Sequence, residues 1–252
     1  MKVADLYAAL DLPAGARVDQ RVPKKLLVEN GAPTSGDKRR INEGIEEVQW
    51  LAALKPTTVG IPEFRDPMRE YLEIAILSVA LRPGAQSGRL SELVHRAVPY
   101  PVVLLSSQGE ALGLSLAHKR WSQGEAGATV LDGALISADL GEGLNSQLWR
   151  AFGDALPMAQ QPGTDLFALY QGWMDTVVAL LASRLTGSFT TPESPEKAEA
   201  RRAALAECAR LEAQMAGLRA SAAKESQVAR QVELNLELKR LESTRAAALA
   251  KL

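Results

Sequence analysis

The C-terminal part of the chain differs in composition from everything before it. Residues 196–252 contain no proline, no aromatic residue and a single glycine, and Ala, Leu, Glu, Lys and Arg dominate them. This composition favours uninterrupted helix. The preceding stretch TTPESPE, residues 190–196, has the composition of a linker. We therefore predict a core domain over residues 1–190 and a helical association module over residues 191–252.

Apolar residues of this module recur at alternating spacings of four and three, the pattern by which helices pack along a seam. Two such seams are out of phase through AAKESQ, so an antiparallel helical hairpin that turns near residues 222–227 is the simplest interpretation. One long helix with a stutter is the alternative. A second stripe, which includes Leu236, is offset from the seam. The predicted interaction residues are Cys208, Leu211, Met215, Leu218, Val228, Val232, Leu234, Leu238 and Leu241.

Strand and helix patterns alternate through the core domain. In EYLEIAILSVAL, residues 70–81, apolar and β-branched residues crowd together as they do in a buried strand. Residues 102–119 predict a β-hairpin, and a further extended piece is expected near Val130. Helical spacing covers residues 1–10, 24–30, 35–48, 89–98, 144–156 and 164–187. The predicted fold is α/β in the broad α+β sense: a central mixed or mostly antiparallel sheet flanked by helices, with the C-terminal hairpin added.

Bulk charge points to neither nucleic acid nor a membrane, because the formal net charge is -1. Residues 194–252 hold 11 Lys and Arg against 8 Asp and Glu, net +3, so residues 1–193 hold 18 against 22, net -4. The N-terminal MKVADLYAALDLP is too polar for a signal peptide, and we expect no membrane span. The single cysteine, Cys208, excludes an internal disulfide and a thiolate-rich zinc site. We expect a cytoplasmic protein without a cofactor or bound metal.

Three residues make the best case for catalysis. Magnesium nucleases combine carboxylates on a central strand with a lysine that orients the attacking water. Here Glu70 and Glu73 lie at the start of the predicted central strand, and Lys119 ends the predicted hairpin, but the usual Glu-x-Lys triplet is missing. A divergent magnesium nuclease using these three residues is therefore an alternative hypothesis, beside a structural role as strand-end charges.

A basic run near the N-terminus offers a nucleic-acid hypothesis. Basic side chains contact phosphates, and Trp121, the last residue of HKRW, is suited to stacking on a base. Acidic residues interrupt the run, so a solvated helix face is the competing interpretation. The residues concerned are Lys24, Lys25, Lys38, Arg39, Arg40, Lys119 and Arg120.

Two smaller features have mainly structural interpretations. The histidines His95 and His118 have no neighbouring cysteines, and we expect them on a helix surface and at a strand end. Pro99-Tyr100-Pro101 separates a predicted helix from a predicted strand. Because each proline fixes φ and removes a backbone donor, we interpret this tripeptide as a structural joint, with a partner-binding corner as the alternative.

Five stretches resemble the bacterial domain-of-unknown-function family 4391: VPKKLLVEN, DKRRINEGIEEVQWLAALKPTTVGIP, EYLEIAILSVAL, HRAVPYPVVLL and QVELNLELKRLE. The resemblance runs in order from about Leu6 to Leu241 and carries over no catalytic residue. It implies a context, because such proteins resemble companions of helicases and DNA methyltransferases in defence or restriction-like gene clusters.

These observations lead to one expectation and two alternatives. We expect a non-enzymatic accessory or assembly subunit of an antiviral, nucleic-acid-processing complex that acts through protein–protein contacts. Its expected partners are a second copy of itself, a helicase or methyltransferase subunit, or both, with DNA as a further partner and no membrane. The alternatives are the divergent nuclease and a nucleic-acid-binding module.

Overall fold

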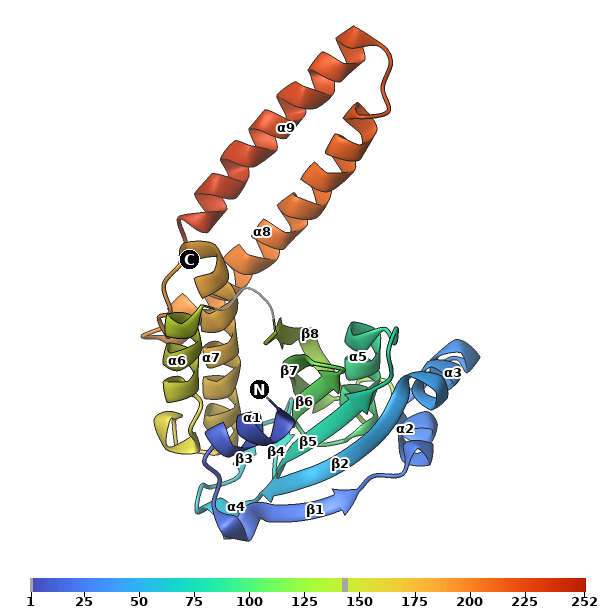
Figure 1. Cartoon of the computed structure of the whole chain (residues 1–252). Helices are drawn as coiled ribbons and strands as arrows, with labels where there is room; N and C mark the ends of the chain where they lie inside the picture. Colours follow the sequence, from blue (N-terminus) through green and yellow to red (C-terminus); the bar gives the residue numbers. More distant parts are fainter. Residues whose placement is uncertain (1, 142–144) are drawn as a thin grey trace. The chain divides into compact units, whose positions relative to one another are not determined.

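The computed structural model describes residues 2–141 and 145–252 (Figure 1). The chain divides into two compact units, Met1–Val177 and Val178–Leu252. This division falls inside a long helix, upstream of the linker at which the sequence suggested a boundary. Each unit is described separately below.

The helices and strands follow one another in mixed order. The first unit contains α1 (Val3–Ala9), β1 (Arg17–Arg21), α2 (Lys24–Gly31), α3 (Ser35–Gly44), β2 (Ile45–Leu54), α4 (Pro56–Val59), β3 (Phe64–Arg65), β4 (Glu70–Tyr71), β5 (Ile74–Leu81), α5 (Ser87–Ala97), β6 (Val102–Gln108), β7 (Ala111–Trp121), β8 (Thr129–Asp139), α6 (Ser146–Ala155) and the start of α7 (Leu166–Thr186). The second unit contains the end of α7, α8 (Pro195–Ala222) and α9 (Val228–Leu249).

The main sheet is mixed, as the sequence predicted. Its strand order is β1-β2-β5-β6-β7-β8, and every neighbouring pair is antiparallel except β5 and β6. The parallel pair needs a crossover, and α5 supplies it. The hairpin predicted over residues 102–119 is confirmed as β6 and β7. A separate two-stranded sheet joins β3 to β4.

Alternate residues of the central strands face two different layers. One face carries Val48, Val79 and Leu104, which pack with Leu27, Ile41, Leu90 and Leu93 of α2, α3 and α5 in one apolar core. The other face meets α1, which packs against β6, and the first half of α7. The hydroxyl of Tyr170 in α7 donates to the carbonyl oxygen of Val102 at 2.7 Å and accepts from the amide of Ala117 at 2.9 Å.

Buried ionic and polar contacts hold the crossover helix α5 at both ends. Near its N-terminus, Arg89 forms two hydrogen bonds with the carboxylate of Asp37 in α3, at 2.8 and 3.0 Å. At its C-terminus, the Lys119 amine from β7 donates to the carbonyl oxygens of His95 and Val98, the latter at 2.7 Å. A helix leaves its last carbonyls without intrahelical partners, and Lys119 satisfies two of them.

The prediction that His95 lies on a helix surface is wrong. Its side chain is fully buried against the sheet, and its Nε2 lies 3.0 Å from the Ser115 hydroxyl of β7. Burial, and then the nearby Lys119, lowers the pKa of His95 to about 3. The imidazole is therefore neutral near pH 7. The apolar residues Leu90, Leu93 and Val94 in the same helix are also buried, so the helix has a wide inner face that includes this histidine.

Pro99-Tyr100-Pro101 connects the end of α5 to β6, where the sequence analysis expected a structural joint. The carbonyl oxygen of Pro101 accepts from the amide of Ala75 at 2.9 Å, which starts the parallel pairing of β5 with β6. Pro99 also contributes its carbonyl oxygen to the Thr129 hydroxyl at 3.0 Å. The carbonyl groups of both prolines thus accept hydrogen bonds that anchor this joint.

Several elements differ from their predicted bounds. The helix predicted over residues 35–48 ends at Gly44, because Ile45–Leu54 pairs with both β1 and β5. Short strands appear at Arg17–Arg21 and Glu70–Tyr71, and the expected extended piece near Val130 is an eleven-residue strand, β8. The predicted first residue of the 144–156 helix, Leu144, lies outside the described residues.

The second unit contains the predicted antiparallel hairpin, in which α8 and α9 are joined by a turn over residues 223–227 (Figure 1). Ser194 caps α8 by accepting from the amide of Lys197 at 3.3 Å, and Pro195 occupies the first turn. The linker-like TTPESPE therefore also starts the helix that follows it.

By length and composition, α7 is apolar enough to cross a membrane, contrary to the expectation that no segment would qualify. However, 67% of its most apolar window is buried inside the protein. That burial is typical of a core helix of a soluble protein. The Trp173 indole N–H, for example, donates to the carbonyl oxygen of Leu156 at 2.9 Å.

Replacing Lys119 by Met is expected to destabilise the protein more at high pH than at neutral pH. Burial, and then Arg96, lowers the pKa of Lys119 to about 8, whereas the unfolded chain keeps this proton up to a pKa of about 10.4. The unfolded state binds more protons between these values, so wild-type stability rises with pH there. The loss in free energy of unfolding caused by Lys119→Met should grow by roughly 2 kcal/mol from pH 7 to pH 10.

Urea unfolding at both pH values measures this difference, with Lys25→Met as the exposed control. A constant difference between wild type and Lys119→Met would show that the amine at the end of α5 titrates normally.

Candidate functional site

Each of the three residues of the nuclease hypothesis engages a different partner in the structure. Glu70 pairs with the Arg65 guanidinium, and Glu73 is 5% exposed and pairs with Lys55 at 3.1 Å. The Lys119 amine donates to backbone carbonyl oxygens at the end of α5. Each group therefore has a separate structural partner. In residues 2–141 and 145–252, no three His, Cys, Asp or Glu side chains are grouped so that they could hold a metal ion.

The residues of the basic run lie on α2 and α3, but acidic or backbone groups engage most of them. Lys24 donates to the Ile45 carbonyl oxygen at 2.8 Å. Lys25 pairs with Glu29 at 3.6 Å, and Arg39 pairs with Glu43 at 2.9 Å. Arg40 approaches Asp37 at 3.3 Å, while Lys38 is exposed. Lys25, Arg39 and Arg40 thus have carboxylate partners, whereas Lys24 binds a carbonyl oxygen, and phosphate binding by this run stays a prediction.

The residues of HKRW point in different directions. His118 stacks on Phe167 with 5.0 Å between ring centroids, and its Nε2 lies 2.8 Å from Gln171. Lys119 is buried on the α5 side, and Arg120 lies 3.7 Å from Asp132. The Trp121 amide donates to the Met68 carbonyl oxygen at 2.8 Å. The segment therefore joins β7 to several neighbours and presents no continuous basic surface.

Most of the predicted interaction residues form the internal seam of the hairpin. Side chains from α8 and α9 alternate at spacings of four and three and face one another. Ion pairs across the helices reinforce the contact, Arg219 with Glu242 at 3.1 Å and Arg245 with Glu212 at 2.5 Å. The buried members of the seam are Ala204, Cys208, Leu211, Met215, Leu234, Leu238 and Ala248, with Leu218 and Leu241 half-buried.

Three other apolar side chains of α9 are exposed. Val228 is 73% exposed, Val232 52% and Leu236 55%. Their spacing of four residues places them in one line along the helix, away from the seam. We call these three residues the α9 stripe. The hairpin closes its seam without them, so the stripe is surface that internal packing of the hairpin does not need.

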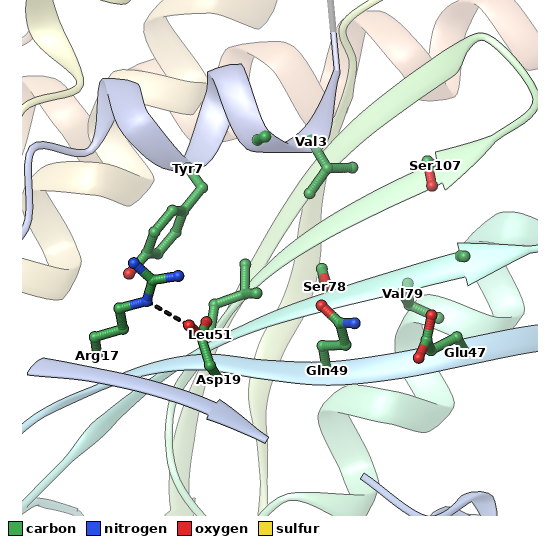
Figure 2. A pocket seen from close by; sticks show the side chains of 12 residues that line it. Val3, Tyr7, Arg17, Asp19, Glu47, Gln49, Leu51, Ser78, Val79 and Ser107 are labelled. Carbon is green, nitrogen blue, oxygen red and sulfur yellow. Dashed lines mark hydrogen bonds and ion pairs between the residues drawn. The ribbon is translucent and has the colours of Figure 1, made fainter. Parts of the chain in front are cut away.

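The sheet carries a polar groove on the face opposite α2, α3 and α5 (Figure 2). Its volume is about 350 Å³, and α1 forms one wall. Glu47, Gln49 and Leu51 line it from β2, while Ser78 and Ser107 form its floor from β5 and β6. Gln49 lies directly opposite Ser78 in the strand register. The groove follows the strands over four residues, or about 13 Å.

One end of the groove combines an aromatic ring with a pair of opposite charges. Tyr7 of α1 points toward Arg17 and Asp19 of β1, which form an ion pair with each other (Figure 2). Burial, and then Asp19, raises the pKa of the Tyr7 hydroxyl. Asp19 has φ 51°, a left-handed conformation, and lies at an irregularity in the pairing of β1 with β2. Such bulges redirect a side chain.

Sequence patterns did not indicate this groove. They predicted no strand over residues 17–21, and the helix predicted over residues 35–48 included Glu47, which the structure places in β2. One signal was present: Glu47, Gln49 and Leu51 alternate with Val48, Trp50 and Ala52, which is the period of a half-exposed strand.

A second recess is apolar and lies beside Pro99 and Tyr100. Its volume is about 320 Å³, and it is also lined by Leu26, Leu27 and Trp50. Tyr100 is 36% exposed and is therefore accessible to a partner. The partner-binding interpretation of Pro99-Tyr100-Pro101 stays a prediction.

Replacing Leu238 and Leu236 separately by Ala should distinguish the seam from the stripe. Leu238 is buried in the hairpin, and truncating it is expected to cost about 2–3 kcal/mol. Leu236 is 55% exposed, and its loss should cost less than about 0.5 kcal/mol. Hydrogen exchange of α9 amides reports local opening. We expect exchange to accelerate roughly 30- to 160-fold in Leu238→Ala and less than about threefold in Leu236→Ala; equal acceleration would contradict the assignment.

Comparison with known proteins gives a family but no activity. The family model described as Domain of unknown function (DUF4391) matches residues 10–244, which is nearly the whole chain. No curated protein and no solved structure matches the chain significantly.

Proposed function

The chain belongs to the DUF4391 family, whose description assigns no activity, and we propose from its own surfaces that it is a non-enzymatic assembly subunit. It acts through protein–protein contacts made by its C-terminal hairpin. The observation that carries this proposal is the α9 stripe, an exposed apolar line on a helix whose internal seam is already closed.

The stripe has the form of a helix-packing surface. Side chains at i, i+4 and i+8 make a ridge that fits between the side chains of another helix. Large apolar residues scattered singly on a surface are common, but three in register on one helix mark an interaction site more often. The hairpin also differs from the rest of the chain in charge. Residues 194–252 are net positive, whereas residues 1–193 are net negative.

A second copy of the chain is the partner that we propose for the stripe. A two-fold contact needs only one surface, since the same stripe serves both copies. Burying three half-exposed side chains from each copy contributes on the order of 1 kcal/mol per side chain, roughly 6 kcal/mol in all. Association costs reduce this value. The expected pairing is therefore weak, with a dissociation constant of tens of micromolar or higher.

The family resemblance supports a wider proposal about context. It favours a cytoplasmic assembly of a defence or restriction-like system in which this subunit joins a helicase or a methyltransferase. The structure supports the non-enzymatic part of the proposal through the separate engagement of Glu70, Glu73 and Lys119.

Charges introduced into the stripe are expected to abolish self-association. Val232→Lys with Leu236→Lys adds two positive charges where the proposed contact excludes water, so burying them would be strongly unfavourable. Glu233→Gln with Glu237→Gln changes the net charge by the same amount on an exposed part of α9 outside the stripe. Sedimentation velocity over a range from about 10 to 500 micromolar, which extends roughly tenfold above the lower limit of the expected dissociation constant, measures the effect.

In that experiment the glutamine control should associate like the native chain, and the lysine variant should stay monomeric. If the lysine variant associates as strongly as the control does, the stripe is not the contact.

A further inference from the structure

The polar groove under α1 is the feature that the proposed assembly role does not use. All of its lining residues lie in the first unit, whereas the α9 stripe lies in the second. An inference about the groove is therefore independent of the proposed function.

The side chains of the central strands become less buried where the groove begins. In β5, residues 74–77 are buried on both faces, but Ser78 and Ala80 are half-exposed while Val79 between them is buried. In β6, residues 102–105 are buried and residues 106–108 are half-exposed. Central strands that are covered on both faces are normally apolar throughout. In β5 the small side chains Ser78 and Ala80 replace apolar ones on the groove face only, and in β6 the polar residues 106–108 are half-exposed on both faces, so this part of the sheet forms an open floor.

The groove has no surplus positive charge. The Arg17 guanidinium is paired with Asp19, and Arg21 lies 3.5 Å from Glu47. An anionic ligand such as a phosphate would have to compete with these carboxylates. A neutral ligand that donates hydrogen bonds is not repelled by these carboxylates and shares their oxygens with the two arginines, because a carboxylate has several acceptor sites; the hydroxyls and the Gln49 amide also accept.

The position of Asp19 gives the groove a defined end. A non-glycine residue in the left-handed region costs on the order of 1 kcal/mol, and aspartate is among the residues that tolerate it best. The bulge at Asp19 places its carboxylate beside Tyr7 and Arg17 (Figure 2). A carboxylate accepts from two neighbouring hydroxyls at once, and an aromatic ring beside it packs on the apolar face of a sugar.

We propose that this groove binds a neutral ring that carries vicinal hydroxyls. Asp19 accepts from the vicinal hydroxyls at one end of the ligand, Glu47 accepts from a hydrogen-bond donor at the other end, Gln49 and Ser78 bind the middle, and Tyr7 packs against the ring. About 350 Å³ and about 13 Å of length suit a nucleoside or a disaccharide. These two sources share the diol chemistry, and the test separates them.

Saturation-transfer NMR on the full chain tests the proposal with three probes: adenosine, 2′-deoxyadenosine and maltose. Deoxyadenosine lacks the vicinal diol, so transfer to adenosine should exceed transfer to deoxyadenosine at least threefold if the ligand is a nucleoside. Transfer to maltose without transfer to either nucleoside would identify a saccharide. No transfer to adenosine or maltose, or equal transfer to the two nucleosides without transfer to maltose, would overturn the proposal.

Two variants locate the binding. Asp19→Asn keeps a residue that tolerates the left-handed backbone and removes the carboxylate. Gln49→Leu removes the amide at the centre of the floor. Each should reduce transfer at least threefold, while Glu29→Gln, exposed on α2, should leave it unchanged. Circular dichroism checks that each variant is folded. If both folded groove variants keep wild-type transfer, the ligand binds elsewhere and the assignment is wrong.

Discussion

The crossover helix α5 is the element on which the arrangement of the sheet depends. It makes β5 and β6 parallel, and polar contacts from two different elements hold its ends. Asp37 of α3 binds Arg89 near the first turn, and Lys119 of β7 binds the last carbonyl oxygens. Burial keeps His95, between these points, neutral. Because both ends of α5 are held, Pro99-Tyr100-Pro101 can turn sharply into β6 and start the parallel pairing at Ala75.

The ionisable groups of the core have structural partners. Lys119, which combines a lowered pKa with burial, directs its amine at backbone carbonyls. Glu73, just before β5, forms an ion pair with Lys55. The chemistry left on the surface is of two other kinds: an exposed apolar line on α9 and a polar groove on the sheet. The first suits a protein partner and the second a small neutral ligand, and neither requires the residues that hold the core together.

Sequence patterns predicted what depends on local periodicity and composition. The helical hairpin, its seam through Cys208 and Leu238, and the β6–β7 hairpin followed from spacing alone. Features that depend on contacts between residues distant in the sequence were not predicted by these patterns. Ile45 and Val48 continue a helical spacing, but pairing with β5 makes them a strand. The burial of His95 depends on Ser115, twenty residues away. The groove needs a bulge at Asp19, which no pattern in the sequence indicates.

Absolute mass in solution, measured by light scattering on the full chain, tests the central claim that this protein works by associating with protein rather than with nucleic acid. The measurement covers concentrations up to several hundred micromolar, with and without a short DNA duplex; this range follows from the weak pairing expected of a small apolar stripe. We predict a mass that rises toward that of a dimer with concentration and does not change when the duplex is added. A chain that stays monomeric throughout and shifts only with the duplex would contradict the account.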